Sequence, residues 1–426
     1  MQDIPLPFPR HLATPSRDDL LRIHRQHERY VVLWLVMELA IVCGCITWIV
    51  AGGGPSATAE TLVLSSVSVL GLFEFLPGLW AANRKLLRDI RADAQFGPHS
   101  RDSLLKCVDH VASTLGLRRC CPVYLVRDKE INAQAVPLAL LPDIGSLAAV
   151  HLNRSVLHLL DEAELKSVIG HELGHVFIYP SLAGRCMLIH AVFAASVTLV
   201  LSGLLAGTEL RLVSPLLALL PARWLAFSSS VFRTRAAEFL CDDCGAEAGG
   251  GEAAMMSHIK IAIEQETRAS LIEQLLEARL LGADIPLETL MATYTAALPF
   301  GVASPAEARI AIQQSIEIIR RDSRGMSLFG FWRFVITGND VDEASLREML
   351  ERGRAVRAVG RVSVRPQDVI AGRATVKQCI SAIENEPTKV FVHLPDEIED
   401  RNDTHPNTSR RLLFLWRCRR CMPLTS

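Results

Sequence analysis

The chain lacks an excess of charge of either sign. Its 45 Lys and Arg residues and 46 Asp and Glu residues give a formal net charge of −1, so no overall field favours nucleic acid or an acidic partner. Hydrophobic residues, by contrast, make up 50% of the 426 residues, and the mean hydropathy of +0.24 is high for a purely soluble protein. They are concentrated in four blocks, which indicates membrane spans in a chain with room for more than one domain.

A disulfide framework is also missing from the sequence. The 11 cysteines have no regular spacing, although Cys241/Cys244 and Cys418/Cys421 form CxxC pairs. A four-cysteine zinc site built from both pairs is one interpretation, but the pairs lie far apart and no turns and strands typical of a zinc ribbon surround them. Reduced thiols in a cytosolic compartment are the simpler interpretation.

Four segments are apolar over about the twenty residues that a helix needs to cross a bilayer. The first is long and lacks a clear small-residue cleavage site, so we expect a retained anchor rather than a signal peptide. A short loop joins the first pair and another joins the second, which predicts two transmembrane hairpins. The expected spans are Tyr30–Ala51, Thr61–Ala82, Cys186–Gly207 and Leu212–Phe232.

Positive residues lie mainly on one side of these spans. Arg and Lys residues precede span one and follow spans two and four, whereas the loop inside the first hairpin has none and that inside the second has only Arg211. Such residues favour the cytosolic side, so both termini and both large polar segments are expected in the cytosol. Four ionisable residues within or near the spans are either functional or extend to the interface: Glu38, Glu74, His190 and Arg223.

The first polar segment carries the most informative motif. Short apolar runs at 122–126 and 147–152 predict strands, and the run from Asp161 to Pro180 predicts an amphipathic helix with an acidic first turn. His171 and His175 therefore lie one turn apart on one face. Two such imidazoles can bind one Zn²⁺ and leave positions for a third protein ligand and a water.

The chemistry expected of such a site is hydrolysis of a peptide bond. Glu172 is placed to accept the proton of the zinc-bound water, which then attacks a carbonyl that the metal polarises. Gly174 keeps the helix slim where substrate or a neighbouring strand would approach.

A third ligand is expected from the segment after span four. Glu238 and Asp242 are four residues apart on an expected helix, so Glu238 can complete a His₂Glu site. Asp242 is placed to hold a ligand histidine by its other ring nitrogen. An exposed carboxylate pair is the alternative, and the thiols of Cys241 and Cys244 could also reach a metal.

Several separate motifs occur in an order that resembles the membrane-bound M48 family of zinc peptidases, the group holding the bacterial heat-shock protease and the CAAX-prenyl protease. The resemblance covers roughly residues 30–315. The matching motifs are Ile131–Ala135, Gly170–His175, Glu238–Asp242 (the ExxxD of the family) and Ser304–Ile310. The sequence departs from the family where Ala236 and Ala237 separate Arg235 from Glu238, and where Ser304-Pro305 replaces the usual His-Pro.

The resemblance implies roles for individual residues. His171, His175 and Glu238 would bind one Zn²⁺ per chain, with Glu172 as general base and Asp242 behind a ligand. An extended substrate would lie along an edge strand, for which the expected residues are Asn132, Ala133, Gln134 and Ala135.

Together these features predict a mainly α integral membrane protein: a gluzincin-like metalloprotease domain with a small β-sheet and four transmembrane helices. We expect a polypeptide substrate, with membrane proteins as one candidate class, a bacterial inner membrane as location, no nucleic acid, and a role in membrane-protein quality control. The expected parts are a cytosolic segment (1–29), hairpin 1 (30–83), the catalytic domain (84–182 and 233–325), hairpin 2 (183–232) and an extension of unknown role (326–426).

Two alternatives and one open segment remain. An intramembrane protease would carry HExxH within a span, whereas this motif lies in a polar helix. A non-catalytic zinc-binding sensor or scaffold is opposed by the intact Glu172, which binding alone would not require. The basic and apolar run Arg410–Leu424 could dock on an anionic membrane surface or pack on the domain.

Overall fold

The computed structural model describes residues 15–53, 59–73, 84–118, 122–126, 133–136, 149–180, 187–218, 230–262, 275, 376–385 and 408–419. Three expectations fall outside these residues: Asn132, the late motif Ser304–Ile310, and most of span four. Glu74 and Arg223 lie outside them as well.

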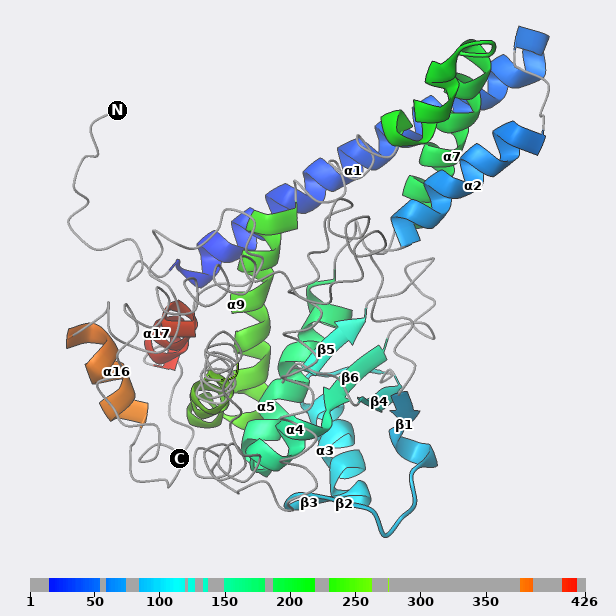
Figure 1. The fold of residues 1–426 in the computed structure, drawn as a ribbon. Coiled ribbons are helices and arrows are strands. Elements are labelled where there is room, and N and C mark those ends of the chain that lie inside the picture. Colours follow the sequence, from blue (N-terminus) through cyan, green and yellow to red (C-terminus); the bar gives the residue numbers. More distant parts are fainter. Residues whose placement is uncertain are drawn as a thin grey trace.

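A long first helix, α1 (Arg17–Trp48), connects the two ends of the molecule (Figure 1). Its N-cap Ser16 accepts a hydrogen bond from the backbone N–H of Asp19, and a short π-helical turn, η2 (Ile49–Gly53), extends it. Helices α2 (Ala59–Phe73) and α7 (Met187–Leu204) pack together beside its far end, and η6 (Glu209–Val213) follows α7.

One helix in the described part of the chain, Arg17–Ala51, is long and apolar enough to span a membrane by length and composition; Ile189–Leu204 is apolar but shorter. Four spans in two hairpins therefore stay a prediction. Within the helical group, Nδ1 of His190 on α7 lies 2.8 Å from the carboxylate of Glu38 on α1, and both residues are buried.

The small sheet that the sequence predicts is present. Its order is β1 (Arg84–Leu86), β4 (Val123–Val126), β6 (Ala149–Asn153) and β5 (Ala133–Val136). β4 and β6 are parallel, whereas β1 and β5 pair antiparallel with their neighbours. Among the described residues, β5 thus has β6 on one side and no strand on the other.

One hydrophobic core lies between this sheet and two helices. Helix α3 (Arg101–Thr114), helix α5 (Glu162–Leu173) and the sheet contribute its fully buried side chains, among them Leu104, Leu152 and Ile169. The turn η4 (Leu87–Asp89), the hairpin β2 (Gln95–Phe96) and β3 (His99–Ser100), and the short helix α4 (Arg154–Leu159) close its margin. This core fixes the position of α5.

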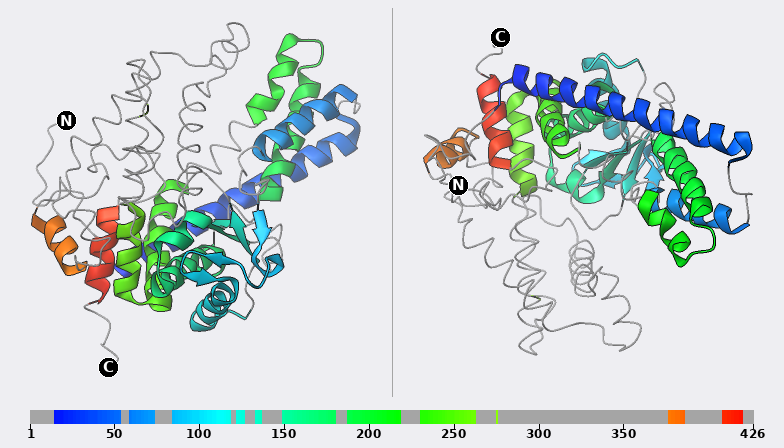
Figure 2. Two further views of the ribbon diagram at one scale, coloured as in Figure 1. Left: turned by 60° about the horizontal axis from the view of Figure 1, so that its bottom comes forward. Right: turned by 90° about the horizontal axis from the view of Figure 1, so that it is seen from above.

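A second core forms around α9 (Ser230–Gly249). The start of α1 and the C-terminal helix α17 (Thr408–Arg419) pack against α9, and α16 (Val376–Asn385) packs on α17 (Figure 2). Leu412 to Leu415 are buried, and the rings of Phe239 and Phe414 meet edge to face at 5.3 Å. Of the two alternatives for the basic and apolar C-terminal run, packing on the domain is therefore what α17 shows.

Helices α5 and α9 lie unusually close because glycines face each other across their contact. A Cβ atom at Gly170 would lie 2.7 Å from Cβ of Ala248, and one at Gly245 would lie 2.7 Å from the carbonyl oxygen of Ser167. A Cβ atom at Gly174 would lie 3.1 Å from Sγ of Cys241. The close approach at Gly174 is therefore that of helix α9, while strand β5 contacts the turn Gly174–Ile178.

Candidate metal centre

Helix α5 begins with a capping box. The side chain of Asp161 accepts a hydrogen bond from the backbone N–H of Glu164, and the side chain of Glu164 accepts one from the backbone N–H of Asp161. These bonds satisfy N–H groups that a helix start leaves unpaired. The helix then continues into a π-helical turn, η5 (Gly174–Ile178), so His171 lies on α5 and His175 on η5.

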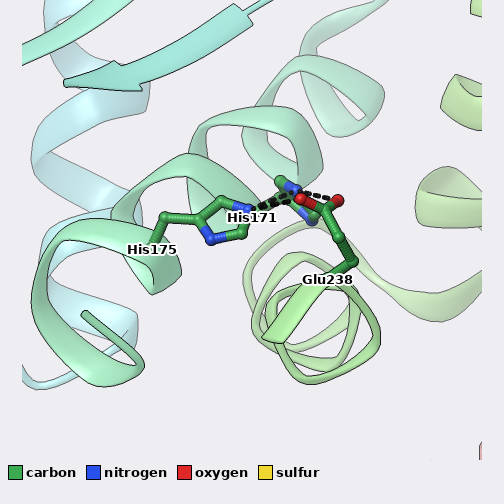
Figure 3. A group of neighbouring side chains, drawn as sticks. All are labelled: His171, His175 and Glu238. Carbon is green, nitrogen blue, oxygen red and sulfur yellow. Dashed lines mark hydrogen bonds and ion pairs between the residues drawn. The ribbon is translucent and has the colours of Figure 1, made fainter. Parts of the chain in front are cut away.

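Three side chains from α5, η5 and α9 point toward one another (Figure 3). Nε2 of His171 lies 3.1 Å from Nε2 of His175. The carboxylate oxygens of Glu238 lie 3.4 Å from Nε2 of His171 and 3.2 Å from Nε2 of His175. Among the described residues these three form the one group of His, Cys, Asp and Glu side chains able to hold a metal ion.

The separations are compatible with a zinc site. Ligand atoms about 2.0–2.1 Å from Zn²⁺ at tetrahedral angles lie about 3.3 Å from one another. The two histidine nitrogens lie 3.1 Å apart, and each has a different oxygen of Glu238 at 3.4 or 3.2 Å. Two imidazoles and one carboxylate are also ligands that zinc prefers in hydrolytic sites, where a fourth position holds water. His171, His175 and Glu238 would thus hold the ion.

Asp242 lies directly behind this group. Its Oδ1 is 3.0 Å from Nδ1 of His171, so His171 can donate this N–H to Asp242 while Nε2 faces the metal position. The same oxygen lies 3.0 Å from Nε2 of His258. Burial alone would raise the pKa of Asp242, but Arg411 and His258 hold it well below its usual value.

Arg411 of α17 provides the positive charge at this centre. Its Nε donates to Oδ2 of Asp242 at 2.8 Å and its Nη2 donates to Oδ1 at 2.5 Å, while Nη1 lies 3.4 Å from Glu238. Burial lowers the pKa of the guanidinium, but the negative charges of Asp242 and Glu238 outweigh this effect and raise the pKa above its usual value. Arg411 therefore stays charged. Such a bidentate pair fixes the orientation of the Asp242 carboxylate and keeps it ionised.

Sequence reasoning missed both His258 and Arg411. The late motif was matched to Ser304-Pro305, although the chain contains the literal pair His405-Pro406 just before α17. That pair was the available signal for Arg411. No local pattern marks His258.

The other predicted residues take the following positions. Glu172 is buried on α5 next to His171. Ala133, Gln134 and Ala135 form part of β5, a strand that contacts both α5 and η5.

The thiols on α9 are not part of this group. Cys241 and Cys244 are buried, and burial raises the pKa of Cys244 to about 12 and that of Cys241 well above its usual value. Both are therefore neutral near pH 7 in the absence of a metal.

Without a metal the site holds a proton. Burial lowers the pKa of His171, but the carboxylates of Asp242 and Glu238 outweigh this effect and raise the value to about 10. A metal ion must displace that proton, because only the neutral imidazole is a ligand.

Comparison with known proteins agrees with this geometry. The sequence profile of Peptidase family M48 matches residues 98–417. A relative named "Protease HtpX homolog", from Paenarthrobacter aurescens (strain TC1), is 34% identical over 117 residues, which cover 26% of this chain and 40% of the relative. No solved structure matches the chain. The family match continues well past residue 315, so limiting the resemblance to residues 30–315 was wrong; the chain belongs to peptidase family M48.

Proposed function

We propose that this protein is a membrane-anchored zinc endopeptidase whose metal ligands are His171, His175 and Glu238. Membership of M48 implies zinc metallopeptidase activity. The observation that carries the residue assignment is the convergence of one ligand atom each from His171, His175 and Glu238, all within 4.8 Å of one another, in the His₂Glu combination that zinc hydrolases use.

A zinc ion held by these residues would polarise a carbonyl and lower the pKa of a water toward about 7. Glu172, next to His171 on α5, would act as the general base and then as the acid for the leaving amine. Asp242 holds the ring of His171 in one tautomer and orientation, and Arg411 holds Asp242. Asp242 on α9 thus orients a ligand on α5, and Arg411 on α17 fixes Asp242 in turn.

The side of β5 that has no neighbouring strand among the described residues is the candidate substrate site. An extended peptide added there would form main-chain hydrogen bonds, which give affinity with modest selectivity for side chains. Such binding suits unfolded or poorly folded polypeptides, and it supports a role in the quality control of membrane proteins. The apolar half of α1 supports anchoring in a membrane. The Arg and Lys residues beside the expected spans favour a cytosolic catalytic part and cytosolic termini.

Two substitutions test the proposal. Glu172→Gln should retain about one zinc per chain and lose nearly all cleavage of an unfolded protein, because only the proton acceptor is changed. Glu238→Ala should lose zinc. A Glu172→Gln protein that still cleaves would remove the assigned general base, and a biological function that survives this substitution would favour the sensor or scaffold alternative.

A further inference from the structure

Helix α1 changes its surface sharply along its length. Up to Arg29 its exposed side chains are mostly charged, including Arg22 and Arg25. From Tyr30 onward they are apolar, and Leu33 is 64% exposed. Arginines favour the water side of an interface and large apolar side chains favour lipid, so the boundary of the membrane lies near Arg29 and Tyr30.

The charged half of α1 is attached to the catalytic part without a break. Nε of Arg17 lies 2.9 Å from Oδ2 of Asp243 on α9. Leu20 is buried in the core around α9. The ring centroids of His24 and Tyr179, the residue after η5, lie 5.6 Å apart. Since α1 is one helix from Arg17 to Trp48, it holds the metal centre at a fixed distance from the apolar half of α1 and therefore from the membrane boundary.

The height of the centre can be counted along α1 and along α9. Arg17, at the start of α1, contacts Asp243 in the second half of α9, and the two helices cross obliquely in roughly opposite directions (Figure 1). At a rise of about 1.5 Å per residue, Arg29 lies about 18 Å from Arg17 along α1, and Glu238 lies about 7.5 Å from Asp243 along α9. The difference, about 10 Å, is the approximate distance of the metal centre from the membrane boundary at Arg29.

The second helix gives a similar value. The expected fourth span ends at Phe232 on α9, and Glu238 lies about 9 Å farther along the helix. Both counts put the metal centre on the order of 10 Å from the membrane boundary.

We infer that this spacing makes the centre a ruler: it cleaves membrane-attached polypeptides only at bonds that reach about 10 Å beyond the end of the substrate's own span. The inference rests on the proposed function and on α1 crossing a membrane. An extended chain covers this height with about three residues at about 3.1 Å each, whereas a helix needs about seven at about 1.5 Å. Bonds closer to the substrate's span cannot enter the site.

A series of single-span substrates tests the ruler. Each would carry the same cleavable unfolded segment on its cytosolic side, separated from the span by a linker of 0, 2, 4, 6, 8, 10 or 12 residues. One series uses a proline-rich, extended linker and the other an alanine-rich, helical linker. Purified full-length enzyme and substrate are reconstituted together in liposomes, with Glu172→Gln enzyme as blank and the segment without a span as soluble control.

Cleavage should rise at least tenfold over a narrow range of linker length and then level off. The residues bound within the site add equally to both series, so the quantity to compare is the difference between the thresholds. The helical series should need about four more residues than the extended series.

Other outcomes overturn the inference. These are equal thresholds in both series, equal cleavage at every linker length, or cleavage of the soluble segment with none of the tethered substrates. The last result would leave the proposed peptidase function intact. If neither soluble nor tethered segments are cleaved, the proposed function fails and the ruler fails with it.

Discussion

The close contact of α5 and α9 makes the metal centre sensitive to a single methyl group at Gly170. A Cβ atom there would lie 2.7 Å from Cβ of Ala248 and 3.0 Å from the carbonyl oxygen of Cys244. Ordinary contacts of this kind begin at about 3.4 Å, so Gly170→Ala must separate the two helices by roughly 0.7 Å. His171 is the next residue on α5, whereas Glu238 lies on α9.

The expected size of the effect follows from this separation. Zinc ligands tolerate deviations of about 0.2 Å, so a shift of 0.7 Å must be reversed locally when the ion binds. Overpacking of this kind costs about 1–3 kcal/mol. If that cost falls on zinc binding, the affinity of Gly170→Ala should drop roughly 5- to 150-fold.

A competition titration with a zinc chelator at fixed pH measures the affinity. Ala248→Gly removes the nearer of the two clashing atoms, so the double variant should recover most of the loss. Gly251→Ala is the control, because no atom lies within 4 Å of its new Cβ. Wild-type zinc affinity in Gly170→Ala, or a double variant no better than the single one, would refute the reasoning.

Three further predictions concern the surroundings of the metal. Arg411→Met leaves the buried carboxylate of Asp242 without its main positive partner, so unfolding in detergent should cost about 3 kcal/mol less, whereas Arg417→Met on the exposed side of α17 should change the thermal midpoint little. Zinc affinity should rise about tenfold per pH unit between about pH 6 and 8, because His171 keeps its proton up to a pKa of about 10; a flat profile by calorimetry would contradict this. Neighbouring N–H groups of a strand point to opposite sides, so Gln134→Pro and Ala135→Pro should differ: one disrupts pairing with β6, and the other retains zinc but loses cleavage of an unfolded protein.

The parts of the site that depend on local spacing could be predicted. His171 and His175 are one turn apart, and so are Glu238 and Asp242, so an i, i+4 pattern in each helix is enough to suggest the ligands and their support. The strand positions at β4 and β6 were also predicted correctly, because β-branched and apolar runs between turns are a local signal.

The parts that depend on distant contacts could not be predicted. Arg411 is 169 residues from Asp242 along the chain, and α17 reaches the site only because its apolar side packs on α9. The separation of α5 and α9 is likewise decided by which glycines face each other, which a single sequence does not show. Periodicity also assumed a regular α-helix through His175, whereas this histidine lies in a π-helical turn.

The contact of Asp242 with Arg411 has a consequence for the order of events during biosynthesis. Ribosomes add roughly 5–20 residues per second, so Asp242 is made roughly 10–30 s before its main positive partner. During that interval His171, His175, Glu238 and Glu172 are already present, but the guanidinium that orients the centre is not. A nascent chain therefore acquires its complete centre only after Arg411 has been made and α17 has packed on α9.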